Sequence, residues 1–155
     1  MIISYYLDTS VFGGYFDAEF EYITKKLFGQ IKFRGIKIIY SELTKNELIN
    51  APKKVKDFIE NLPEDTLDYI EITDEALELA DKYILEKVVG ITSREHCIYI
   101  ALDTLNRANV LVSWNFKHIV NLARIRGYNS VNLKDGYPTI EIRSPKELID
   151  YEDNN

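Results

Sequence analysis

The strongest constraint on the fold is a regular alternation between short, apolar, β-forming runs and longer segments with helical spacing. The runs expected to form strands are Ile2–Leu7, Ile36–Tyr40, Tyr69–Ile72, Asn109–Ser113 and Thr139–Arg143. The segments expected to form helices are Phe20–Phe33, Ser41–Leu48, Val55–Leu62, Asp74–Val88, Thr92–Leu105 and about Phe116–Arg126. Strands that alternate with helices predict an α/β domain with a mostly parallel central sheet and helices on both of its faces.

Polar residues at the expected helix starts agree with this reading. Ser41, Thr73 and Thr92 each precede a helical segment and are suitable N-caps. Thr92 and Glu95 have the spacing of a capping box, and the segment 144–147 (SPKE) adds proline at the first helical position to a second such box. These signals predict where the helices begin.

Length and composition favour one ordinary globular domain. The chain has 155 residues, 46% of them hydrophobic and 28% charged, and we assign residues 1–150 to the domain and 151–155 to a polar tail. No apolar run approaches the roughly 20 residues that span a bilayer, and no signal-peptide pattern is visible. The single cysteine, Cys97, excludes an internal disulfide framework. We therefore expect a cytoplasmic protein without a membrane partner.

The net charge does not by itself indicate a nucleic-acid partner. The chain has 19 Lys and Arg against 25 Asp and Glu, a formal charge of −6. Global electrostatics therefore do not attract nucleic acid, although a cation bound by carboxylates restores attraction locally.

Three polar residues stand at positions where the fold predicts a site. In parallel α/β sheets, ligands bind outside the carboxyl ends of the strands. Asp8 directly follows the first run, where it is a site acid, a turn residue or a cap for the next helix. Glu47 lies six residues past Ser41, too far for capping or a dipole effect, and is either a site acid or an exposed residue. Asn115 follows the fourth run and is either a neutral ligand or an N-cap.

The helix that begins near Thr92 carries four residues of interest. Glu95 has a sufficient role as a cap. Tyr99 and Asp103 fall with Glu95 on the more polar side, so we expect Asp103 to be solvated. His96 lies at the edge between the two sides, where it is either a neutral metal ligand or a half-buried histidine with a hydrogen-bond partner.

Other chemistries have weaker support. The sequence has no phosphate-binding GxxxxGK loop, GxSxG elbow, CxxC or HExxH. Cys97 and Trp114 are interpreted as packing residues, and His118 as a histidine that is at the surface or interacts with the helix dipole. The strand-end residues therefore remain the best candidates.

Four segments together resemble the PIN-domain family, and most closely its VapC-type toxins and their stand-alone relatives. They are YYLDTSVF, SELTKNEL, EHCIYIALDTLNRANVLVSWNFKHIVN and YPTIEIRSPKELI, in the family's order over nearly the whole chain. The resemblance implies a PIN-like three-layer sandwich with an acidic pocket at the strand ends. It also implies an endoribonuclease that uses Mg²⁺ or Mn²⁺, possible membership of a type II toxin–antitoxin pair, a small antitoxin partner and a homodimer.

The resemblance also maps the pocket onto this chain. Asp8, Glu47 and Asn115 match catalytic positions, and Asp8, Glu47 and His96 match metal-binding positions. His96 and Asn115 stand where many members have aspartate, so two negative charges fewer imply weaker Mg²⁺ binding, and an imidazole favours softer ions. Two alternatives stay open: a catalytically weakened PIN domain that binds RNA or protein, and, more distantly, an α/β phosphotransfer protein.

Overall fold

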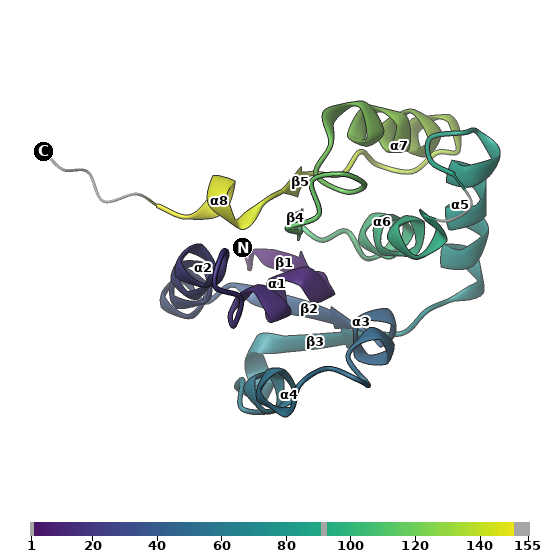
Figure 1. Cartoon of the computed structure of the whole chain (residues 1–155). Coiled ribbons are helices and arrows are strands. Elements are labelled where there is room, and N and C mark those ends of the chain that lie inside the picture. The colour runs from purple at the N-terminus through teal and green to yellow at the C-terminus, as the bar shows by residue number, and fades with distance from the viewer. Residues whose placement is uncertain (1, 91–92, 151–155) are drawn as a thin grey trace, which may run out of the picture.

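One parallel sheet of five strands organises the chain (Figure 1). The structure is a computed structural model that describes residues 2–90 and 93–150. The strands are β1 (Ser4–Leu7), β2 (Lys37–Ser41), β3 (Leu67–Ile70), β4 (Val110–Val112) and β5 (Ile142–Arg143), in the spatial order β3-β2-β1-β4-β5. Every pairing is parallel, which confirms the expected sheet.

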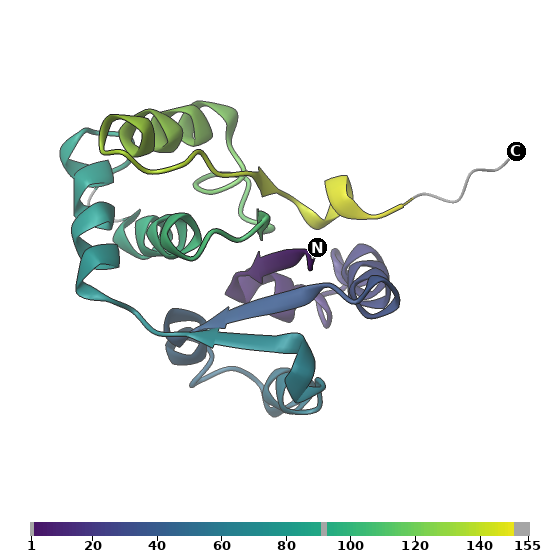
Figure 2. The same ribbon diagram turned by 180° about the vertical axis from the view of Figure 1, so that it is seen from behind.

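Helices cover both faces of this sheet. They are α1 (Thr9–Gly14), α2 (Glu21–Arg34), α3 (Glu42–Glu47), α4 (Lys53–Glu60), α5 (Asp74–Leu85), α6 (Arg94–Asn106), α7 (Leu122–Lys134) and α8 (Pro145–Leu148), with a 3₁₀ turn, η1 (Glu64–Thr66). Figures 1 and 2 show α5, α6 and α7 gathered on one side. None of the helices in the described ranges has the length and apolarity needed to cross a bilayer.

Two hydrophobic cores result from the alternation of side chains along the strands. Tyr6 and Leu111 point to the core formed with α5, α6 and α7. Leu7 and Val112 point to the other core, formed with α1, α2 and α4. The expected three-layer sandwich is therefore confirmed.

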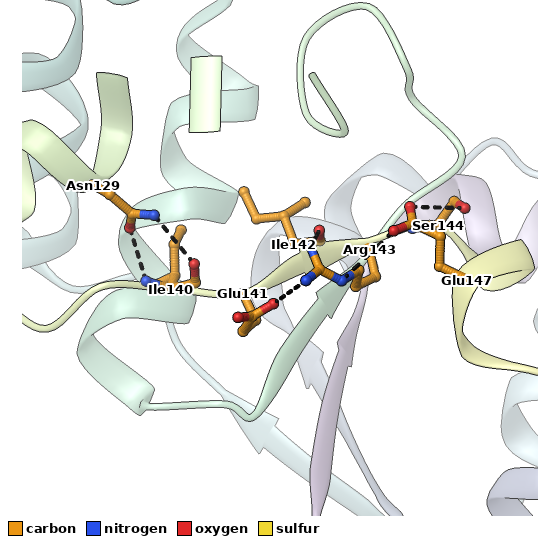
Figure 3. A network of polar contacts seen from close by, with 7 residues as sticks. All are labelled: Asn129, Ile140, Glu141, Ile142, Arg143, Ser144 and Glu147. Carbon is orange, nitrogen blue, oxygen red and sulfur yellow. Dashed lines mark hydrogen bonds and ion pairs between the residues drawn. The ribbon is translucent and has the colours of Figure 1, made fainter. Parts of the chain in front are cut away.

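Strand β5 is shorter than the predicted Thr139–Arg143 because side chains occupy its backbone (Figure 3). Asn129 Oδ1 accepts from the Ile140 N–H at 2.8 Å, and its Nδ2 donates to the Ile140 carbonyl at 3.3 Å. Arg143 donates to the Ile142 carbonyl at 3.1 Å and pairs with the Glu141 carboxylate at 2.8 Å. The amide of Asn129 thus takes the place of a neighbouring strand.

Strand β3 occupies Leu67–Ile70 and not the predicted Tyr69–Ile72. The Ile72 N–H donates to Glu42 Oε2 at 3.0 Å, so the chain has already left the sheet there. Strand β1 begins at Ser4 and not at the predicted Ile2, and Ile2 and Ile3 are exposed.

The helix predicted near Phe116–Arg126 is wrong in its bounds, because α7 begins at Leu122 and continues to Lys134. The Val120 N–H bonds to the Asn115 carbonyl at 2.8 Å and closes a turn. Asn121 then caps α7 by accepting from the Arg124 N–H at 3.2 Å. The helix continues through Gly127, where a Cβ would lie 2.7 Å from a methyl group of Val88. Glycine at this position is therefore a packing requirement and does not end the helix.

The other helix starts largely follow the sequence. Ser41 and Thr73 cap α3 and α5, each accepting a backbone N–H at 3.2 Å. The Ser144 N–H donates to Glu147 Oε1 at 3.1 Å, which confirms the predicted capping box. Thr92 lies outside the described residues, and α6 begins at Arg94.

Candidate functional site

Asp8 is a buried carboxylate at the end of β1, next to the end of β4. Only 4% of the residue is exposed. Its Oδ1 accepts from Ser10 Oγ at 2.6 Å and its Oδ2 from Ser113 Oγ at 2.5 Å. Burial raises the pKa of Asp8 to about 6, because the two serine bonds only partly offset it and the charge of Glu47 adds to the shift. Asp8 stands at the N-cap position of α1, but its side chain makes no capping bond.

Glu47 is the second acid, and Thr9 places it beside Asp8. It is the last residue of α3 and is exposed. Its Oε1 accepts from Thr9 Oγ1 at 2.9 Å and also from Tyr99 Oη. Because Thr9 directly follows Asp8, the structure brings the two predicted acids together at the carboxyl edge of the sheet.

Asn115 and His96 form a second pair. Asn115 Oδ1 accepts from the His118 N–H at 3.0 Å, and its Nδ2 lies 3.2 Å from His96 Nε2. The amide therefore donates to Nε2, and the proton of a neutral His96 is on Nδ1. The Asn115 N–H donates to Ser113 Oγ at 2.9 Å, so this pair shares Ser113 with Asp8.

The surroundings of His96 favour its neutral form. It is half-buried, and its ring stacks on His118 with centroids 4.9 Å apart. Burial lowers the pKa of His96, and the neighbouring His118 lowers it further. His118 was expected at the surface but is also half-buried. Within residues 2–90 and 93–150, no three His, Cys, Asp or Glu side chains are grouped so that they could hold one metal ion. The assignment of His96 as a ligand therefore stays a prediction.

Two expectations for α6 are wrong. Asp103 was expected to be solvated but is fully buried, and neither carboxyl oxygen has a hydrogen-bond partner among the described residues. Burial raises its pKa well above the ordinary value. Tyr99 was placed on the same polar side but is 2% exposed and binds Glu47. The reason is that all residues from Cys97 to Thr104 are buried, so α6 has no polar side along this stretch.

The hydroxyl groups that hold the two acids were not predicted from the sequence. Thr9, Ser10, Ser113 and Tyr99 are the donors to Asp8 and Glu47. Of these residues, Ser113 could have been identified, because it stands at the end of the fourth apolar run, where site residues are expected. The packing role of Trp114 is confirmed, since its ring stacks on that of Phe20 with the ring centroids 4.3 Å apart. Cys97 is confirmed as a core residue.

Comparisons with known proteins show the fold. No family model matches the chain, and no curated protein matches it. The chain is similar to VapBC2 from Rickettsia felis bound to a DNA fragment from its promoter, with a TM-score of 0.57, 11% identity and coverage of 92% of this chain and 98% of that chain. It is also similar to DNA-bound VapBC from Salmonella typhimurium, with a TM-score of 0.57, 15% identity and coverage of 93% and 99%. The chain therefore shares the fold of these VapBC structures, which is the PIN-like three-layer sandwich that the resemblance implied.

Proposed function

We propose, from the PIN-domain fold that the chain shares with VapC toxins, that this protein is a metal-dependent endoribonuclease. The observation that carries the proposal is the pair Asp8 and Glu47, which Thr9 links at the carboxyl ends of the central strands. The same fold supports a role as the toxin of a toxin–antitoxin pair.

The donor set fits a hard divalent cation. Mg²⁺ is commonly held by one or two carboxylates together with substrate phosphate and water. Asp8 and Glu47 are two such carboxylates, and they lie close enough for the charge of Glu47 to add to the burial that raises the pKa of Asp8. They would hold Mg²⁺ or Mn²⁺. His96 would join, and favour a softer ion, only if Asn115 released its Nε2.

Each residue of the site then has a defined task. When bound, the cation offsets charge on the scissile phosphate and makes a water molecule more acidic. Ser10 and Ser113 fix the two oxygens of Asp8. Asn115 uses one amide N–H on His96, and its second N–H is suited to a phosphate oxygen or the attacking water.

The test is cleavage of single-stranded RNA in Mg²⁺, Mn²⁺ or EDTA by the wild type and by Asp8→Asn. We expect metal-dependent cleavage that the variant loses. Asp103→Asn is the matched control, because Asp103 is another buried aspartate that makes no hydrogen bond among the described residues. It should cut like the wild type. A folded wild type that cuts with none of the metals would refute the enzyme proposal.

A second candidate is a PIN domain that binds RNA or a protein without cutting. The observation that favours it is the lack, within the described ranges, of a third acidic or metal-ligating side chain grouped with Asp8 and Glu47. RNA retention on a filter without cleavage in any metal would support this reading over the first.

The partner proposals follow from the solved complexes. The similar structures are VapBC assemblies, so we propose a small antitoxin as a partner of this chain. Co-expression with the product of an adjacent small reading frame should give a complex that no longer cuts RNA. Light scattering of the purified chain tests the proposed homodimer, and cell fractionation tests the proposed cytoplasmic location.

A further inference from the structure

A continuous row of buried hydroxyl groups ends on Glu47, and we propose that Tyr99 is the positioning residue that fixes this carboxylate for the cation. The inference rests on the proposed function, because it assigns a task to Tyr99 at the same site. We infer which oxygen of Glu47 is offered to the ion and which groups of the protein hold the other oxygen.

The row crosses four elements of the fold. Tyr6 Oη on β1 donates to Ser41 Oγ at the end of β2, at 2.7 Å. Ser41 Oγ lies 3.1 Å from Thr44 Oγ1 on α3, which lies 3.0 Å from Tyr99 Oη on α6. Tyr99 Oη donates to Glu47 Oε1. The contacts are therefore consecutive from the core of the protein to the site.

The hydrogen atoms of this row run from Tyr6 towards Glu47. Each hydroxyl has a single hydrogen, and an ionised carboxylate only accepts. Ser41 Oγ already accepts from Tyr6 Oη and from the Thr44 N–H, so its hydrogen goes to Thr44 Oγ1. Thr44 then donates to Tyr99. Tyr99 Oη lies against both Glu47 Oε1 and Thr9 Oγ1, the latter 2.8 Å away, and Thr9 Oγ1 is itself bonded to Glu47 Oε1, so the row ends on Glu47. Hydrogen bonds aligned in this way polarise one another and strengthen the last bond.

Burial makes the row a rigid support. Tyr6, Ser41 and Thr44 are fully buried and Tyr99 is 2% exposed, whereas Glu47 is exposed. An exposed glutamate at the end of a short helix has several rotamers available. A buried donor that cannot move favours the one rotamer that reaches it. Tyr99 therefore holds the Glu47 side chain in a fixed position.

The two donors to Glu47 also distinguish its two oxygens. Tyr99 Oη and Thr9 Oγ1 both bond to Oε1, and no hydrogen bond to Oε2 is found among the described residues. Oε1 is thus held by the protein, and Oε2 is the oxygen offered to a cation. Groups that orient a metal ligand through hydrogen bonds commonly change metal affinity or activity about 10- to 100-fold when removed.

The first experiment measures Mn²⁺ binding by electron paramagnetic resonance, and RNA cleavage, for Tyr99→Phe. We expect Mn²⁺ binding about 10-fold weaker and a similar loss of cleavage. Tyr83→Phe is the matched control, because Tyr83 is fully buried and donates to Asn132, outside the row. It should bind and cut like the wild type.

A double variant separates positioning from a general structural effect. If Tyr99 acts through Glu47, Tyr99→Phe combined with Glu47→Gln should bind Mn²⁺ no more weakly than Glu47→Gln alone. Additive losses, or a Tyr99→Phe variant that binds Mn²⁺ like the wild type, would overturn the inference.

Proton NMR of the metal-free protein gives a readout that needs no activity. The hydroxyl proton of Tyr99 should resonate downfield in the wild type and move upfield in Glu47→Gln. A Tyr99 resonance that does not respond to Glu47→Gln would also contradict the inference. A wild type that neither binds Mn²⁺ nor cuts RNA is a different outcome, since it refutes the proposed function and with it the task of the hydroxyl row.

Discussion

Asp8 is predicted to weaken the fold at neutral pH, so Asp8→Asn should give an inactive but more stable protein. The pKa of Asp8 is raised from 3.8 to about 6. Between these two values the folded state binds more protons than the unfolded state, so the contribution of Asp8 to stability falls as the pH rises from about 4 to 6. Above pH 6 the full penalty is present.

The size of the penalty follows from the same two values. The difference between 3.8 and about 6 corresponds to about 3 kcal/mol of unfolding free energy at pH 7. Asparagine removes this charge but has only one carbonyl oxygen, so either Ser10 or Ser113 loses its acceptor, at a cost of about 1 kcal/mol. We therefore expect a net gain of about 2 kcal/mol, or roughly 4–8 °C in melting temperature for a chain of this length.

Urea unfolding of the wild type and Asp8→Asn at pH 7.5 and at pH 4 measures the gain. The variant should be more stable at pH 7.5. Near pH 4 Asp8 is protonated in the folded state, so this gain should be lost and the variant should be slightly less stable than the wild type, because only the lost serine bond remains. Asp68→Asn is the control, because Asp68 is an exposed aspartate on β3 and should show no gain. Equal stabilities of Asp8→Asn and the wild type at pH 7.5 would refute the argument from burial.

Three further outcomes are expected. Asp103→Leu should raise the unfolding free energy by about 1–3 kcal/mol in urea titrations, because it removes a buried carboxyl without a partner among the described residues; a loss of stability would contradict the reasoning. Gly127→Ala should lower the melting temperature, because its Cβ would lie 2.7 Å from Val88, whereas Gly13→Ala, with open space around it, should not. His96→Asp should lower the Mg²⁺ concentration needed for half-maximal cleavage, because it restores a carboxylate; an unchanged Mg²⁺ dependence would place His96 outside the ion's reach.

The part of the site at the strand ends could be predicted from the sequence. A parallel sheet brings the carboxyl ends of its central strands to one edge, so Asp8 and Asn115 were identifiable from their positions after two apolar runs. Glu47 was identifiable because neither capping nor the helix dipole explained it.

The hydroxyl row and the buried acid could not be predicted in this way. Periodicity identifies the buried side of a helix only when another side faces water, and α6 is enclosed from Cys97 to Thr104. Tyr99 and Asp103 therefore looked solvated from their polarity alone. The contacts of Tyr99 with Thr44 and Glu47 join segments more than 50 residues apart, and no local pattern encodes them.

The side chains along β5 also determine how another protein can approach the sheet. An edge strand with free backbone groups is a template on which a second chain can add a strand. At β5, Asn129 occupies both the N–H and the carbonyl of Ile140, and Arg143 occupies the carbonyl of Ile142 (Figure 3). A partner at this edge would first have to displace these side chains. We therefore expect recognition at this edge to use side chains and helix surfaces, and the same arrangement hinders edge-to-edge pairing at β5.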